Sequence, residues 1–178
     1  MFETERLIIR RFTVEDIDDV YNCCNDFEVV KTTLGLPWPY TKEIAKNWIC
    51  KLLEKEESGI SYEFAICFKE NPSKVIGCVS LMDINLRAKR AEMGYWVARK
   101  YWRQGIATEA AEVMIKFGFK QLGLHSIIAR YFDINPASGK VMQKCGMKFV
   151  GIIRDHEFRF DKYYNVGYYE MLESDKTE

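Results

Sequence analysis

The chain has 178 residues, of which 48% are hydrophobic and 14% aromatic, so it can bury a sizeable core. This composition argues against disordered and fibrous proteins. Lysine plus arginine equals aspartate plus glutamate at 26 each, and the resulting net charge of zero gives no general attraction to nucleic acid or to an anionic membrane.

Other features of the composition predict a cytoplasmic protein without a metal. The segment from Met1 to Arg6 lacks the basic and then apolar layout of a signal peptide. No apolar run approaches the roughly 18 residues of a membrane span. The cysteines form no Cys-x-x-Cys pair, and only 2 histidines accompany them, so a zinc site is not expected. Free thiols fit a reduced compartment, and burial is the ordinary role for most of them.

The first part of the chain predicts a strand and two helices. Residues 6–10 form the strand, and Thr13 with the acids after it marks a helix start. After an interruption at 36–39, Thr41 can cap a second helix with an apolar stripe. No linker, repeat or low-complexity stretch divides the chain, so residues 1–178 are expected to form a single domain.

The second part predicts strands at about 61–68, 75–84, 91–98, 126–131, 147–153 and 166–172. One helix is expected over about 105–122, and Asn135 and Pro136 open another that Gly146 ends. The early hairpins make the sheet mostly antiparallel, whereas the later strand–helix–strand connection requires a parallel pair. The expected fold class is therefore a mixed α/β sandwich and not a doubly wound nucleotide fold.

The most informative segment, residues 99–110, lies between a predicted strand and an amphipathic helix. It begins with clustered cations, and Gly105 and Ala107 leave the backbone uncovered where the helix starts. The first N–H groups of a helix lack internal partners and carry partial positive charge, so a pyrophosphate fits this turn. An ordinary turn with solvated basic residues is the alternative. The glycine patterns of nucleoside-triphosphate and dinucleotide sites are absent.

Several segments keep the order of a known family. Residues 92–97, 101–110, 135–138 and 144–149 read EMGYWV, YWRQGIATEA, NPAS and KCGMKF. Together they resemble the GCN5-related N-acetyltransferase (GNAT) superfamily, and the opening Thr-Glu-Arg-Leu is similar to its ribosomal-protein-alanine N-acetyltransferase branch. The resemblance implies a mostly antiparallel central sheet flanked by helices, with a splayed parallel strand pair at the cofactor site. It also implies acetyl-CoA as the acetyl donor and no metal.

The resemblance further implies how coenzyme A is held. The backbone N–H groups of the 103–108 turn would bind its pyrophosphate; these residues are Arg103, Gln104, Gly105, Ile106, Ala107 and Thr108. Trp102 stands at the position where the family usually has Gln or Arg, so Arg103 is expected to supply the positive charge instead. The pantetheine arm would pair with backbone near Trp96 and Val97. Asn135 would contact the coenzyme, with a plain helix cap as the alternative.

Acetyl transfer requires an amine that loses a proton, a polarised thioester carbonyl and a leaving thiolate that gains a proton. Glu92 is the candidate base, directly or through a water; a carboxylate satisfied by neighbouring basic residues is the alternative. Ser138, at the third helical position, is the candidate proton donor or thiol contact. The resemblance places a tyrosine of many relatives at Met142, which cannot donate a proton. An ordinary first-turn role for Ser138 is the alternative.

Two aromatic-rich segments, 34–40 and 155–164, are candidate walls of the amine pocket. The expected acceptor is a protein or peptide N-terminus. A small-molecule amine such as an amino acid, a polyamine or an antibiotic is the alternative acceptor, and a non-catalytic acyl-CoA-binding module or a nucleotide-binding module is the alternative class. No nucleic acid or membrane partner is expected, and a homodimer is left open.

Overall fold

The structure is a computed structural model that describes residues 1–176, without the side chains of 53–57 and 176. Residues 177 and 178 of the expected domain lie outside this part. Within the described residues, no helix combines the length and the apolarity needed to cross a bilayer.

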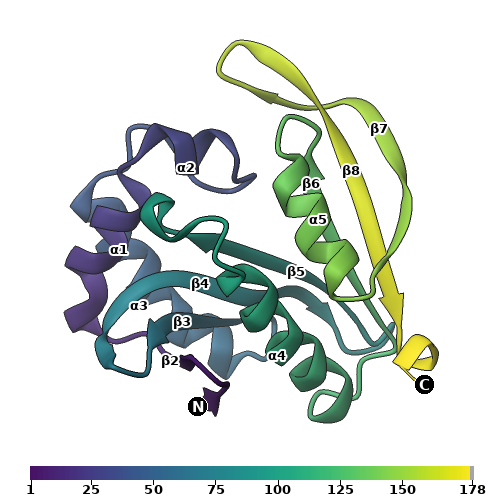
Figure 1. The fold of residues 1–178 in the computed structure, drawn as a ribbon, viewed down its shortest axis with the longest axis horizontal. Helices are drawn as coiled ribbons and strands as arrows, with labels where there is room; N and C mark the ends of the chain where they lie inside the picture. The colour runs from purple at the N-terminus through teal and green to yellow at the C-terminus, as the bar shows by residue number, and fades with distance from the viewer. Residues whose placement is uncertain (177–178) are drawn as a thin grey trace.

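One sheet of eight strands organises the chain in the order β1-β2-β3-β4-β5-β6-β8-β7 (Figure 1). The strands are β1 (Phe2–Glu3), β2 (Leu7–Arg11), β3 (Tyr62–Phe68), β4 (Asn71–Asn85), β5 (Arg90–Val97), β6 (Ser126–Phe132), β7 (Lys148–Arg159) and β8 (Lys162–Leu172). The β5–β6 pair is parallel and the other pairs are antiparallel. This confirms the predicted mixed, mostly antiparallel sheet.

Helices cover both faces of the sheet. They are α1 (Ile17–Cys24), α2 (Phe27–Lys31), α3 (Lys42–Glu57), α4 (Ile106–Lys120) and α5 (Pro136–Lys144), with short 3₁₀ turns η1 (Val14–Asp16), η2 (Arg99–Tyr101) and η3 (Glu173–Lys176). Helices α1 and α3 lie on one face, and α4 and α5 on the other (Figure 1). Each face has its own apolar cluster, and burying one large aliphatic or aromatic side chain contributes about 1.5–3 kcal/mol.

Alternation along β5 divides its side chains between the two clusters. Met93 and Val97 pack in the cluster beneath α4, whereas Trp96 packs with the α1 and α3 cluster, 6.4 Å between ring centroids from Trp48. The strand is therefore fixed from both sides, and side chains on it have defined directions.

The parallel pair separates before its strands end. The β5–β6 ladder runs from Arg90↔Ser126 to Met93↔Ala129, although β5 continues to Val97 and β6 to Phe132. On its other side β6 remains paired with β8 as far as Phe132↔Val166. A gap therefore opens inside the sheet from Gly94 onward, next to the start of η2.

The structure differs from the sequence expectation at several places. Strand β1, before the first expected strand, was not predicted. Helix α2 was not predicted, and the β7–β8 hairpin extends through residues 154–165, where a loop was expected. Phe160 and Asp161 turn this hairpin with φ values of 51° and 58°. Such a turn with two left-handed residues usually carries Asn-Gly, and Phe160-Asp161 lacks that signal.

Candidate active site

The 103–108 turn presents free backbone N–H groups. Gly105 has φ 79° and precedes α4 without a side-chain cap, and the N–H of Glu109 donates to its carbonyl at 3.0 Å. The N–H groups of residues 106–108 therefore have no acceptor inside the helix. Arg103, with φ 62°, is exposed beside them. This backbone and its positive charge fit an anionic diphosphate.

Side chains behind the turn hold its shape. The indole Nε1 of Trp102 donates to the carbonyl of Val97 at 2.7 Å. The side-chain amide of Gln104 donates to the carbonyl of Lys100 at 3.2 Å. Ile106 is buried in the core, whereas Ala107 and Thr108 are half-buried. Trp102 thus fastens the turn to the end of β5.

Backbone groups of β5 line the gap between β5 and β6. The backbone N–H of Ala98 donates to the carbonyl of Ile76 on β4 at 2.9 Å. Because backbone groups alternate along a strand, those of Trp96 also point toward β4, and those of Tyr95 and Val97 point toward the gap. Because Trp102 occupies the Val97 carbonyl, the N–H of Val97 and the backbone of Tyr95 are the groups available there. The side chain of Trp96 is buried and contributes packing.

Glu92 lies one residue before the parallel ladder ends, on the same face of β5 as Trp96. Its Oε1 accepts from Arg130 Nε at 2.8 Å, and Arg130 Nη1 lies 3.6 Å from Glu157. Burial lowers the pKa of Arg130, but hydrogen bonds and charge attraction to Glu92 and Tyr168 together raise it above its ordinary value. Glu92 is thus ion-paired, as its alternative interpretation expected, and it also stands at the opening of the gap.

The opposite face of β5 brings Tyr95 to helix α5. Its hydroxyl lies 2.9 Å from the carbonyl oxygen of Ser138 and 3.0 Å from the Ser138 Oγ. Burial raises the pKa of Tyr95, so the phenol keeps its proton at neutral pH. The Tyr95 hydroxyl was not singled out from the sequence. Alternation along the predicted strand could have indicated it, because it places Tyr95 on the face opposite Glu92.

Asn135 caps α5, because its Oδ1 accepts from the N–H of Ser138 at 3.3 Å. Its Nδ2 donates to the carbonyl of Thr32 at 3.2 Å, which ties the start of α5 to the end of α2. Met142, further along α5, is buried in the core. Asn135 and Ser138 thus lie together on one helix start, at the β6 side of the gap.

The two candidate wall segments meet through α2. The ring of Phe27 lies 5.2 Å from Trp38 and 5.2 Å from Phe160, centroid to centroid. Arg159 donates to the carbonyls of Val30, Thr33 and Leu36. The hairpin tip and the 34–40 segment, far apart in the sequence, therefore form one continuous surface, which we call the acceptor wall.

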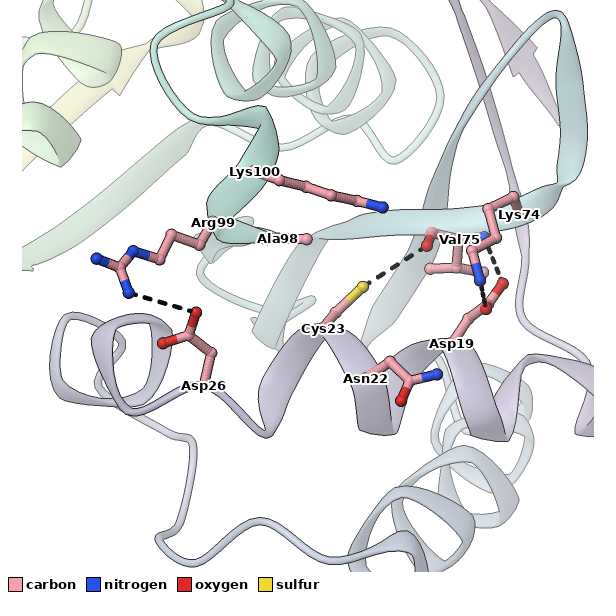
Figure 2. Close-up of a pocket in the computed structure, with 9 residues that line it drawn as sticks. All are labelled: Asp19, Asn22, Cys23, Asp26, Lys74, Val75, Ala98, Arg99 and Lys100. Carbon is pink, nitrogen blue, oxygen red and sulfur yellow. Dashed lines mark hydrogen bonds and ion pairs between the residues drawn. The ribbon is translucent and has the colours of Figure 1, made fainter.

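A pocket of about 260 Å³ lies between α1 and the residues that join β5 to η2, Ala98 to Lys100 (Figure 2). Asp19 pairs with Lys74, and Asp26 lies 3.9 Å from Arg99. The side chain of Lys100 extends toward the middle of the pocket in Figure 2. The pocket is therefore lined by both acidic and basic side chains. No group of three or more potential ligand residues within the described chain could hold a metal ion.

The sequence of the chain matches the acetyltransferase (GNAT) domain family over residues 6–148. The chain belongs to the GNAT acetyltransferase family. The match covers all the site residues described above except those of the β7–β8 hairpin.

Individual relatives agree with this assignment. The uncharacterized N-acetyltransferase p20 of Bacillus licheniformis is 30% identical over 169 residues, 95% of this chain and 94% of that protein. The ribosomal-protein-serine acetyltransferase of Escherichia coli is 28% identical over 141 residues, 78% of this chain and 77% of its own. The structure of a spermidine N-acetyltransferase from Vibrio cholerae with CoA and spermine has a TM-score of 0.84 at 20% identity, covering 97% of this chain and 98% of that one. This last likeness is one of fold.

Proposed function

We propose that this GNAT protein transfers an acetyl group from acetyl-CoA to a primary amine by direct attack, within a single domain. The observation that carries the proposal is the free N–H groups at the start of α4, beside the gap where β5 and β6 separate. A helix start binds an anion, and a gap between strands admits an extended chain that pairs with backbone. The relatives named N-acetyltransferases support the same chemistry.

Acetyl-CoA, when bound, supplies an acetyl group activated as a thioester. The 103–108 turn would hold its diphosphate, with Arg103 contributing charge. The N–H of Val97 and the backbone of Tyr95 would pair with the extended arm, and Asn135 would close the β6 side. In this arrangement a backbone N–H of β5 can polarise the carbonyl.

The two faces of β5 separate the proton acceptor from the proton donor. Glu92 takes the proton of the attacking amine, directly or through a water, while Arg130 holds the carboxylate in place. Ser138 donates the proton needed by the leaving thiolate, and Tyr95 orients the Ser138 hydroxyl. The new C–N bond forms as the C–S bond breaks, so no covalent link to the protein is required.

A protein or peptide N-terminus is the proposed acceptor. The ribosomal-protein-serine acetyltransferase relative supports it, and the long acceptor wall offers a surface that an extended peptide can follow. A polyamine is the second candidate, since Glu157 and Asp155 place carboxylates on the same hairpin and a structural neighbour acts on spermidine.

The test is release of free CoA from acetyl-CoA with a panel of peptides and small amines. Peptides with a free N-terminus should be acetylated, and the same peptides with a blocked N-terminus should not. If spermidine is acetylated faster than any peptide, the acceptor is a polyamine and not a peptide N-terminus. Tight acetyl-CoA binding without turnover of any amine would make the protein a binding module and contradict the proposed enzyme.

A further inference from the structure

Arg6, just before β2, bridges both sides of the 103–108 turn. Its Nη1 donates to the carbonyl of Gln104 at 3.0 Å, on the side of the turn that precedes Gly105. Its Nε and Nη2 donate to the Glu109 carboxylate at 2.8 and 2.6 Å, in the first turn of α4. One planar guanidinium thus joins the residues that flank the free N–H groups.

The carboxylate of Glu109 is itself fixed from several directions. Its Oε1 accepts from the backbone N–H of Arg6 at 3.1 Å and from Thr4 Oγ1 at 2.5 Å. Burial acts to raise the pKa of Glu109, but the hydrogen bonds from Thr4 and Arg6 lower it. Glu109 is therefore a fixed anion with a side-chain exposure of 17%, against which Arg6 is oriented.

This anion stands at the end of α4 where the diphosphate is proposed to bind. Unpaired, it would repel a second anion at the same helix start. Arg6 cancels that charge and at the same time restrains the peptide between Gln104 and Gly105. Its Nη2 lies 3.4 Å from where a Cβ on Gly105 would stand, so the guanidinium supports the turn directly.

We infer that Arg6 is a positioning residue for the cofactor, which holds the 103–108 turn in its anion-binding shape and neutralises Glu109. The inference rests on the proposed function of the turn. An ion pair that only fastened the N-terminal strands to α4 would contribute to folding stability, but it would have no selective effect on acetyl-CoA affinity.

The experiment is calorimetric measurement of the acetyl-CoA Kd for the wild type, Arg6→Met and Arg10→Met. Arg10 is the matched control, because it lies on β2 and forms a bidentate pair with Asp16, away from the turn. Arg6→Met should raise the Kd about tenfold, whereas Arg10→Met should leave it within about twofold. Equal affinity in wild type and Arg6→Met, or equal weakening in both variants, overturns the inference.

A milder variant covers the case in which Arg6→Met does not fold. Arg6→Lys keeps the charge near Glu109 but cannot reach both Glu109 and Gln104 with a planar fork. It should bind acetyl-CoA about threefold more weakly, with faster amide hydrogen exchange at residues 105–108. Affinity and exchange equal to the wild type would contradict the positioning role. Absence of acetyl-CoA binding in the wild type would instead remove the proposed function and the inference with it.

Discussion

Arg130 of β6 donates to Glu92 of β5 at 2.8 Å, across the parallel strand pair. Glu92 lies one residue before the point where the two strands separate. The ion pair gives a carboxylate on a central strand a fixed orientation at the mouth of the gap. The guanidinium also lies 3.6 Å from Glu157 of the hairpin, so it links the proposed base to the acceptor wall.

Glu92→Gln should lower kcat by about 10²–10⁴-fold, because the amide keeps the shape of the side chain but cannot accept a proton. The acetyl-CoA Kd should stay unchanged. Glu157→Gln is the comparison, since it removes the other carboxylate on Arg130 without removing the base. Steady-state kinetics and calorimetry on both variants check this, and a Glu92→Gln enzyme with wild-type kcat would exclude Glu92 as the base.

Gly105→Glu should weaken acetyl-CoA binding by at least about tenfold, because it places bulk and negative charge at the helix start. Gly123→Glu is the matched control, since Gly123 also has a positive φ, 62°, with nothing within 4 Å of an added Cβ. Both variants carry similar backbone strain, of order 1 kcal/mol. Similar acetyl-CoA affinities for the two variants in calorimetry would remove the 103–108 turn from the cofactor site.

Arg159→Met should loosen the acceptor wall, because the carbonyls of Val30, Thr33 and Leu36 lose their donor. The expected loss of unfolding free energy is about 1–2 kcal/mol. The KM for the amine should rise while the acetyl-CoA Kd stays constant. Arg154→Met, at an exposed position of the same strand, is the control. Unchanged amine KM in Arg159→Met would show that the wall does not contact the acceptor.

The free cysteines predict an alkaline limit to stability. Burial raises the pKa of Cys67 from 9.0 to about 11 and that of Cys23 from 9.0 to about 12. Each of these thiols holds its proton more tightly in the folded state than in the unfolded state. The resulting stability is fully present below pH 9 and is lost as the pH rises through the folded-state pKa. Urea unfolding should therefore show a falling free energy between about pH 9 and 11; a constant value there would contradict the burial of these thiols.

The same burial predicts selective labelling. Cys50 is exposed on α3, whereas Cys23, Cys24, Cys67 and Cys78 are buried and Cys145 is half-buried. A thiol reagent acts on accessible thiolates, so mild alkylation at pH 8 should modify Cys50 first. Peptide mass spectrometry checks the order, and early modification of Cys67 would contradict the packing of the α1 and α3 cluster.

Regular elements with strong periodicity could be predicted from the sequence. Helix α4 and strand β5 follow local patterns of apolar residues, and the Asn135-Pro136 pair marked the start of α5. Helix α2 could not be predicted in this way. It has five residues, and Arg159 contacts its Val30 from 129 positions away in the sequence.

The candidate site likewise has a part that could be predicted from local sequence and a part that could not. The 103–108 turn is local, so its glycine and basic residues identified it. The pairs Glu92–Arg130 and Tyr95–Ser138 depend on the register between β5 and β6 and on the position of α5 over the sheet. Such register is set by long-range packing, which a single sequence does not specify.

A crystal structure with acetyl-CoA tests the central claim most directly. The account predicts diphosphate oxygens within hydrogen-bonding distance of the backbone N–H groups of residues 103–108, with the extended arm in the gap between β5 and β6. Acetyl-CoA bound elsewhere, with this turn and gap filled by the protein's own side chains, would contradict it.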